Sequence, residues 1–157
     1  MKEIKGDIWN VDADAICITT NGVVKKNGEC VMGRGIALEA ANRYPNMPKK
    51  LGELIQKYGN SVHIIGNMIR ESLLKIHGIT AFTYVLSFPV KHHFKDIADL
   101  DIIKQSCIDL KNLADIMSWQ KVVLVKPGCG CGKRDWETEV KPIVSELLDD
   151  RFEVIDR

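Results

Sequence analysis

The sequence lacks the features that would place it in or across a membrane. No stretch approaches the ~18 consecutive apolar residues of a transmembrane helix, and residues 1–5 contain no apolar run of the kind that opens a signal peptide. The 5 cysteines are odd in number and lack paired C-x-x-C spacings, so no disulfide framework is expected. Together these absences predict a cytoplasmic protein with reduced thiols.

An excess of charge of one sign is also absent. Lys and Arg number 22 and Asp and Glu number 21, which gives a net charge of +1. The chain as a whole is therefore not driven toward nucleic acid or membrane, and such a partner requires a local basic patch. At 157 residues, with 45% hydrophobic residues and no repeat or linker, we expect one domain that spans residues 1–157.

Strand-like and helix-like segments alternate along the chain. Apolar and β-branched runs predict strands, and apolar residues at helical spacing predict helices. The predicted strands are residues 2–9, 13–20, 61–69, 79–88, 121–125 and 152–155, and the predicted helices are residues 36–44, 51–58, 100–117 and 140–147. Pro142 either lies near the start of the last helix or removes one of its backbone hydrogen bonds. The alternation predicts an α/β fold, a three-layer α/β/α sandwich around a mixed, mostly parallel central sheet of about six strands.

Two glycine-rich stretches lie at the ends of predicted elements. Residues 33–37 open a helix, and residues 127–132 follow a strand. Free N–H groups in such turns bind anions, and a helix N-terminus adds partial positive charge. The first stretch lacks the Gly-Lys-Ser/Thr of a Walker loop, and Leu38 occupies the third glycine position of a dinucleotide-binding loop. The two stretches therefore predict a site for the phosphates of a nucleotide-like ligand, held by backbone amides.

Polar residues mark one edge of the predicted sheet. Asn21, Lys91 and Gly128 each follow a predicted strand, and ligands of open α/β sheets bind beyond the carboxyl ends of the strands. Lys91 has two interpretations, as a residue of a solvated loop or as an amine nucleophile or phosphate contact. Asp7 either caps a turn or accepts a hydrogen bond from an exocyclic amine.

The cysteines raise two further interpretations. Cys129 and Cys131, with Cys30 and His92 or His93, form one candidate metal-binding set. Zinc sites usually combine two close ligand pairs, which this spacing does not supply. A nucleophilic cysteine needs a neighbouring base, of which the sequence gives no sign. We therefore expect neither a metal ion nor another cofactor.

Four motifs, taken in order, resemble the macrodomain family, the ADP-ribose-binding module. They are Gly6-Asp7-Ile8, the segment from Ala15-Ile16 to Thr20-Asn21, Val31 to Ala37, and Pro127 to Gly130 followed by Trp136. The match covers nearly the whole chain. The run Met-Gly-Arg-Gly-Ile-Ala and the segment Phe88-Pro89-Val90-Lys91-His92-His93 resemble the branch that contains hydrolases and the antitoxins that remove ADP-ribose from DNA. In that branch a lysine after this strand takes part in catalysis.

The resemblance implies ligand-binding roles for the residues of these motifs. Asp7 would accept a hydrogen bond from the adenine amino group with the backbone of Ile8 beside it, and Asn21 would hold the distal ribose. The residues implied to enclose the diphosphate and distal ribose are Met32, Gly33, Arg34, Gly35 and Ile36 on one side, and Gly128, Cys129, Gly130, Cys131 and Gly132 on the other.

The resemblance also implies that the protein hydrolyses an ADP-ribosyl linkage on modified nucleic acid or protein. Lys91 would attack or polarise C1″ of the distal ribose, and Asn21 would orient that ribose against the lysine. Some relatives carry an acidic residue at the position that matches Gly132. Asp135, three residues later, is the alternative, as the activator of a water. Two other functions stay open: a phosphatase acting on ADP-ribose 1″-phosphate and a non-catalytic ADP-ribose reader.

The expected partner is ADP-ribose or an ADP-ribosylated macromolecule, bound by a monomer. Basic residues in predicted loops form a candidate contact for nucleic-acid phosphates. They are Lys25, Lys26, Lys91, His92, His93, Lys95, Lys133 and Arg134. The alternative is that these side chains are scattered and solvated.

Overall fold

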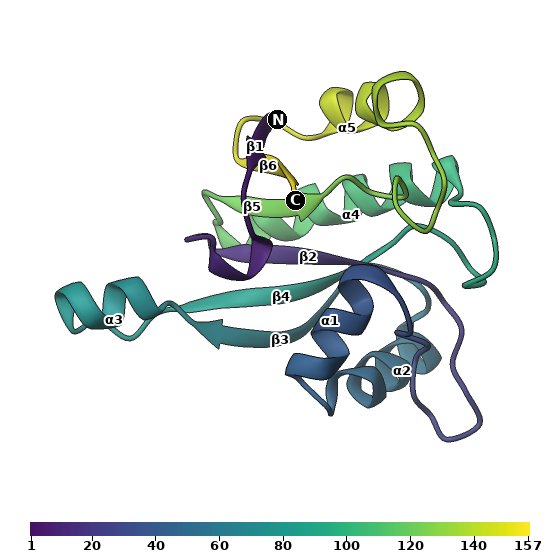
Figure 1. The fold of residues 1–157 in the computed structure, drawn as a ribbon, viewed down its shortest axis with the longest axis horizontal. Coiled ribbons are helices and arrows are strands. Elements are labelled where there is room, and N and C mark those ends of the chain that lie inside the picture. Colours follow the sequence, from purple (N-terminus) through teal and green to yellow (C-terminus); the bar gives the residue numbers. More distant parts are fainter.

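Six strands form one sheet in the computed structural model, which describes residues 1–157 (Figure 1). The strands are β1 (Lys2–Lys5), β2 (Ala15–Thr20), β3 (His63–Ile69), β4 (Phe82–Pro89), β5 (Val122–Val125) and β6 (Phe152–Asp156). Their order across the sheet is β1-β6-β5-β2-β4-β3. Every neighbouring pair is parallel except β3 and β4. The predicted mixed, mostly parallel sheet is confirmed.

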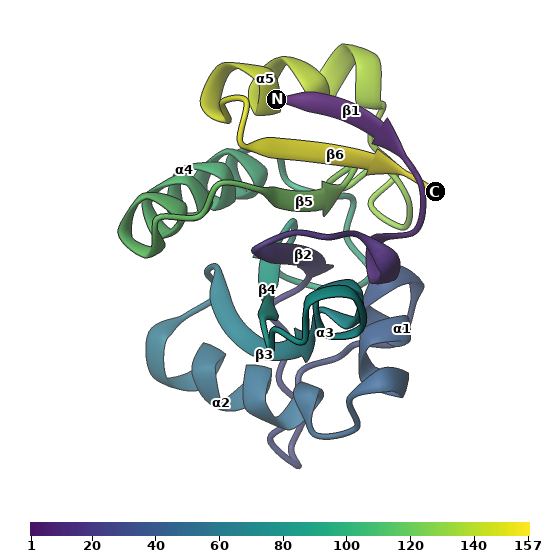
Figure 2. The same cartoon turned by 90° about the vertical axis from the view of Figure 1, so that its left-hand side faces the viewer.

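Helices cover both faces of this sheet (Figures 1 and 2). They are α1 (Gly35–Arg43), α2 (Met47–Tyr58), α3 (Glu71–His77), α4 (Leu100–Met117) and α5 (Lys141–Leu147), with short helical turns η1 (Ile8–Asn10) and η2 (Trp136–Val140). Alternate residues of a strand point to opposite faces. Ile16 and Ile18 of β2 accordingly pack in the core under α1 and α2. Ala15 and Cys17 pack in the core under α4 and α5.

The first predicted strand is too long. β1 ends at Lys5, because the Asp7 side chain accepts a hydrogen bond from the Trp9 N–H at 3.0 Å and starts the turn η1. Residues 2–9 therefore divide into a strand and a capped turn. Pro142 lies in the first turn of α5, which is the first of its two predicted alternatives.

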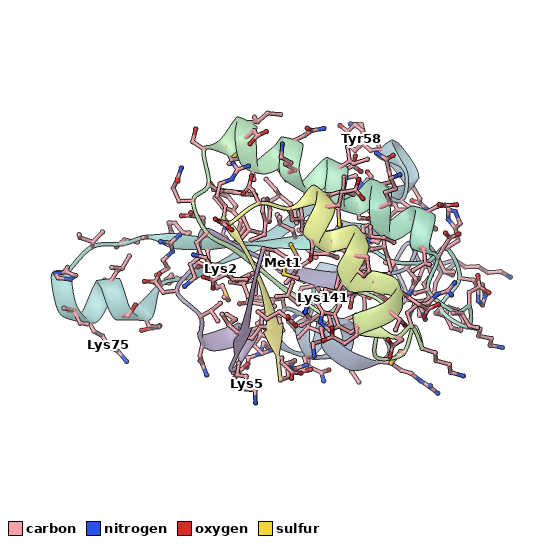
Figure 3. The ribbon with its side chains drawn as sticks, turned by 90° about the horizontal axis from the view of Figure 1, so that it is seen from above. Met1, Lys2, Lys5, Tyr58, Lys75 and Lys141 are labelled. Atoms are coloured by element: carbon pink, nitrogen blue, oxygen red, sulfur yellow. The ribbon has the colours of Figure 1, made fainter.

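The sequence analysis missed α3, which lies between β3 and β4. None of its side chains is buried, so its sequence has no buried apolar face whose spacing would predict a helix. It ends at Gly78, which adopts the left-handed conformation, and β4 begins at Phe82 rather than at residue 79. Figures 1 and 3 show α3, marked by Lys75 in Figure 3, projecting from the body of the molecule.

No helix in the structure combines the length and the apolar character that a membrane span requires.

Candidate functional site

A cavity of about 680 Å³ lies where β2, β4 and β5 end. Asn21, Lys91 and Gly128 all line it, as their positions after three strands predict. Parallel strands bring their carboxyl ends to one edge, so residues distant in the sequence meet there. A volume of this size suits a nucleotide-sized ligand.

The N-terminus of α1 forms one wall of the cavity. Gly33, Arg34, Gly35, Ile36 and Ala37 all line it. The side chain of Arg34, which precedes the helix, makes no capping hydrogen bond. The first-turn N–H groups of a helix have no acceptor within the helix, and they carry the positive end of its dipole. The structure therefore directs unpaired amide donors toward the cavity from this side.

The loop after β5 forms the opposite wall. Gly128, Gly130, Cys131, Gly132 and Lys133 line the cavity. Hydrogen bonds from Lys133 N to Gly130 O (3.0 Å) and from Arg134 N to Gly128 O (2.9 Å) close this loop on itself. The N–H groups of Gly130, Cys131 and Gly132 donate to no protein acceptor. Successive unpaired N–H groups of this kind form an anion-binding concavity.

The glycines of the two loops divide into two kinds. A Cβ added at Gly33 or Gly130 would meet no atom within 4 Å, and neither residue has a positive φ. Neither packing nor backbone conformation explains these two glycines. By contrast, Gly128 has a φ of +73°, and a Cβ there would lie 2.7 Å from the Ala98 Cβ. Gly128 is required by the fold, whereas Gly33 and Gly130 keep the cavity open.

Gly132 is required by packing. A Cβ at this position would lie 2.5 Å from Gly128 O and 2.7 Å from the Ala98 Cβ. Backbone atoms do not yield as a flexible side chain would, so no acidic side chain fits here without rebuilding the loop.

Lys91 lines the cavity just beyond the end of β4. The residue is only 7% exposed, which is rare for lysine. Its Nζ donates hydrogen bonds to the carbonyl oxygens of Phe94 and Asp96, both at 3.1 Å. Two hydrogen bonds and the bond to Cε occupy three of the four tetrahedral positions of Nζ. The fourth position has no protein partner.

Asn21 and Thr20 lie beside Lys91 at the end of β2. Asn21 Nδ2 donates to Val31 O at 2.9 Å, and Asn21 Oδ1 accepts from Val23 N at 3.0 Å. The amide therefore fastens both ends of the segment that precedes α1, and one Nδ2–H stays free. Thr20 is 4% exposed and lines the cavity, yet its hydroxyl has no hydrogen-bond partner. The sequence analysis placed Thr20 in a motif but gave it no role in the site.

The charges around the cavity have one sign. The charged residues among its lining are all basic: Arg34, Lys91, Lys95, Lys133 and Arg157. No carboxylate lines it, although acidic and basic residues are almost equal in number in the chain. This local excess favours an anionic ligand. Arg157 also lines the cavity, and no motif of the sequence analysis pointed to it.

Five of the predicted site residues lie outside the cavity lining: Asp7, Ile8, Met32, Cys129 and Asp135. Ile8 and Met32 are buried in the core beneath α1. Asp7 is exposed and caps η1. The hydrogen bonds from Arg157 to Glu39 raise the pKa of Arg157 despite partial burial, and the charge of Asp7 adds to this rise. The Gly6 N–H donates to Asp156 O at 3.1 Å, so Asp7 follows directly on a residue bonded to the strand end that leads into Arg157, which lines the cavity.

Asp135 caps the turn that leads into α5. Its Oδ2 accepts hydrogen bonds from the Thr138 hydroxyl at 2.6 Å and the Thr138 N–H at 2.8 Å. These bonds hold the pKa of Asp135 below its usual value. A carboxylate that is satisfied in this way is a weak general base.

The cysteines of the candidate metal set do not converge. Cys30 is buried in the core, and this burial raises the pKa of its thiol to about 11. Burial likewise raises the pKa of Cys129 to about 11, and its Sγ lies 3.4 Å from Pro127 O. Cys131 alone of these lines the cavity, and it is exposed. No group of three His, Cys, Asp or Glu side chains is close enough to hold a metal ion.

Comparison with known proteins gives relatives over most of the chain. No protein-family model matches it. DNA ADP-ribosyl glycohydrolases of Mycobacterium tuberculosis and Mycobacterium bovis are both 31% identical over 140 residues, or 89% of this chain. This chain spans 36% of the length of those relatives.

Solved structures share the fold. The macrodomain of Mycobacterium tuberculosis DarG superposes with a TM-score of 0.72 at 25% identity, over 99% of this chain and 97% of that one. The structure of Thermosipho africanus DarTG in complex with ADP-ribose gives a TM-score of 0.73 at 20% identity, over 98% of this chain and 40% of that one. From the order of its motifs, its six-stranded sheet and these likenesses, the chain belongs to the macrodomain family, in the branch of the DarG macrodomains.

Proposed function

We propose that the cavity binds ADP-ribose, with the diphosphate between the two glycine-rich loops. Unpaired N–H groups approach from α1 on one side and from residues 130–132 on the other. Gly33 and Gly130 leave room for the ligand to reach these groups. A diphosphate is the anion that two facing amide clusters bind together.

The same proposal assigns an end of the cavity to each ribose. The distal ribose lies beside Asn21 and Lys91, where the free Thr20 hydroxyl gains a partner. A buried hydroxyl left without a partner costs about 1–3 kcal/mol, so a ligand that bonds it binds more tightly. The adenine extends toward Arg157, which lines the cavity, and Asp7, which follows the Gly6 bonded to Asp156, accepts a hydrogen bond from the adenine amino group.

We further propose that the protein hydrolyses an ADP-ribosyl linkage on DNA. The position of Lys91 carries this proposal: it lines the cavity, and two carbonyl oxygens hold its amine. Nζ attacks C1″, the bond from C1″ to the departing base breaks, and the base takes the electron pair and the proton that Nζ releases. Water then hydrolyses the lysyl adduct, which yields ADP-ribose and the free amine.

DNA is the favoured carrier for two reasons. Relatives with 31% identity are named DNA ADP-ribosyl glycohydrolases, and only basic charges line the cavity. Lys95 and Lys133, both exposed at the cavity, are the proposed phosphate contacts of the predicted basic rim. Arg134 is instead occupied: it donates hydrogen bonds to Glu139 at 3.1 Å and to Ala98 O at 2.7 Å.

We propose that residues 1–157 act as one monomeric domain in the cytoplasm, where the cysteines stay reduced.

A non-catalytic ADP-ribose reader is the second candidate. The closed space at Gly132 and the capping role of Asp135 favour it, because both remove a carboxylate that could assist hydrolysis. In the reader, Lys91 serves only to hold the loop through Phe94 and Asp96.

The deciding experiment is a product assay on three substrates side by side. ADP-ribosylated single-stranded DNA, ADP-ribosylated protein and ADP-ribose 1″-phosphate are incubated with the protein, and released ADP-ribose and phosphate are quantified. The proposal requires turnover of the DNA substrate above the other two. Phosphate release from the third substrate alone would make the protein a phosphatase. ADP-ribose binding without turnover of any substrate would make it a reader.

A further inference from the structure

The loop that follows β4 places the ring of Phe94 in the cavity lining, with the ring of His93 stacked on it. Phe94 lines the cavity and is 40% exposed. The ring of His93 stacks on it, with 4.3 Å between the ring centroids and 28° between their planes. Phe94 belongs to neither hydrophobic core. Burial in the core therefore does not explain why a phenylalanine occupies this position.

Hydrogen bonds hold this pair in place. His93 Nδ1 accepts from the backbone N–H of Lys95 at 3.1 Å, and His93 O accepts from Asp96 N at 3.0 Å. The Phe94 carbonyl accepts from Lys91 Nζ. The rings are thus built on the same short turn that fixes the amine, and they need little ordering when a ligand arrives.

The surroundings of the rings are basic. Lys95 follows Phe94 directly and lines the cavity, and Lys133 lines it from the opposite loop. Lys133 keeps a positive φ of 59°, a conformation uncommon outside glycine that tends to persist at binding sites. Exposed aromatic rings between lysines are the arrangement with which proteins bind single-stranded nucleic acid, because bases stack on the rings and phosphates pair with the cations.

We propose that Phe94 and His93 form a stacking platform for the DNA base that carries ADP-ribose, and that Phe94 makes the protein prefer single-stranded DNA. This inference rests on the proposed function. The base is bonded directly to C1″, the atom that Lys91 attacks, so the base leaves within a few ångströms of Nζ. Phe94 is the aromatic residue bonded to that Nζ through its carbonyl. A base inside a duplex is covered on both faces, so it stacks there only after it leaves the helix.

The test uses the product complex, so it needs no turnover. The protein is saturated with ADP-ribose, and the binding of an unmodified, fluorescently labelled, single-stranded oligonucleotide is followed by anisotropy. Phe94→Ala should weaken oligonucleotide binding by about tenfold, the usual effect of removing one stacking ring. Its affinity for free ADP-ribose, measured by calorimetry, should fall by less. Phe94→Trp should restore DNA binding, since a larger ring presents the same flat face.

Phe82→Ala is the matched control. Phe82 is 46% exposed and opens β4 at the end away from the cavity, so its loss should not change DNA binding. Equal DNA affinity of Phe94→Ala and Phe82→Ala would overturn the platform, as would an equal or greater loss of ADP-ribose affinity in Phe94→Ala. Duplex DNA that binds as tightly as the single strand would overturn the preference.

Turnover of ADP-ribosylated DNA by the unmutated protein is measured in parallel. Absent turnover refutes the hydrolase, whereas the binding comparison still decides the platform. Turnover of ADP-ribosylated protein that falls with Phe94→Ala as much as turnover of DNA would also count against a base-stacking role, because a protein side chain presents no base.

Discussion

At the scale of single residues, the site consists of positions that the fold itself leaves unexplained. Gly33 and Gly130 have room for a side chain and an ordinary backbone. Thr20 has a buried hydroxyl without a partner. Lys91 is a buried lysine whose Nζ is bonded to two carbonyl oxygens and to no carboxylate. The stability of the fold alone does not explain the residue at any of these four positions, and all four residues line one cavity. Such local departures are expected where function, rather than folding, has selected the residue.

The open glycines give the first prediction. Gly33→Val and Gly130→Val should abolish ADP-ribose binding, because the side chain fills the space through which the ligand reaches the amides. Both variants should melt close to the unmutated protein, since no atom opposes the new Cβ. Gly132→Ala is the contrasting variant and should lower the melting temperature, because its Cβ meets Gly128 O. Calorimetry and thermal melts measure the two effects. Normal ADP-ribose binding by both valine variants would place the ligand elsewhere.

The amine gives the second prediction. Lys91→Ala should reduce turnover of an ADP-ribosylated substrate by at least ~100-fold while ADP-ribose affinity changes a few-fold. Asn21→Ala should reduce both, since Asn21 holds the segment before α1 and orients the ribose. Lys104→Ala, an exposed lysine on α4, is the control and should leave both unchanged. Full turnover by Lys91→Ala would refute the lysine mechanism.

At the scale of elements, the strands and long helices were predictable and the capped turns were not. β2, β5 and α4 are continuous apolar or periodic segments, and α4 has the predicted bounds of residues 100–117. α3 has no buried side chain, so it leaves no periodic pattern to detect. The end of β1 depends on a side-chain cap by Asp7. The sequence predicted that Asn21, Lys91 and Gly128 share one edge of the sheet, because the ends of the strands could be predicted. The open space at Gly33 could not be predicted, because it depends on how the structure packs.

Asp14 illustrates how one side chain joins elements, and it gives the third prediction. It accepts hydrogen bonds from Arg70 at 2.7 Å and from the N–H groups of Gln120 and Lys121 at 2.7 and 3.0 Å. Burial by itself would raise the pKa of Asp14, but these bonds outweigh it and the pKa lies below its ordinary value. Asp14→Ala should reduce the free energy of unfolding by about 1–3 kcal/mol at neutral pH.

The pH dependence follows from the sign of that shift. A lowered folded-state pKa stabilises the protein above the unfolded value of about 3.9, and this contribution disappears as the pH falls through the folded-state pKa. The stability difference between the unmutated protein and Asp14→Ala should therefore be constant above about pH 5 and shrink in stronger acid. Urea unfolding at several pH values measures it. A difference that grows toward low pH would contradict the role of the charged carboxylate.

At the scale of the whole molecule, the two walls of the cavity come from distant parts of the chain. Residues 33–37 include the first turn of α1, and residues 127–132 follow β5. β2, at the centre of the sheet, lies between β5 and β4. A ligand held by both walls therefore links the half of the molecule under α1 to the half under α4. Binding should stabilise the fold as one unit.

The fourth prediction concerns this stabilisation. ADP-ribose at 100 times its dissociation constant should add about 2.7 kcal/mol to the free energy of unfolding, because it binds only the folded chain. For a chain of this size the melting temperature should rise by roughly 5–10 °C. The Gly33→Val variant should show no rise, which separates specific binding from a general effect of the nucleotide. An unchanged melting temperature at millimolar ADP-ribose would contradict the proposed ligand.

The projecting helix α3 has a practical consequence. It has no buried side chain, and it lies at the end of β3 and β4 away from the cavity. A cut within it leaves one fragment with β1, β2, β3 and the first loop, and another with β4, β5, β6 and the second loop. Neither fragment has a complete sheet, because β1 pairs with β6 and β2 lies between β4 and β5. Since each fragment contributes one wall, the ligand would drive their reassembly, and a reporter split at α3 would signal ADP-ribose.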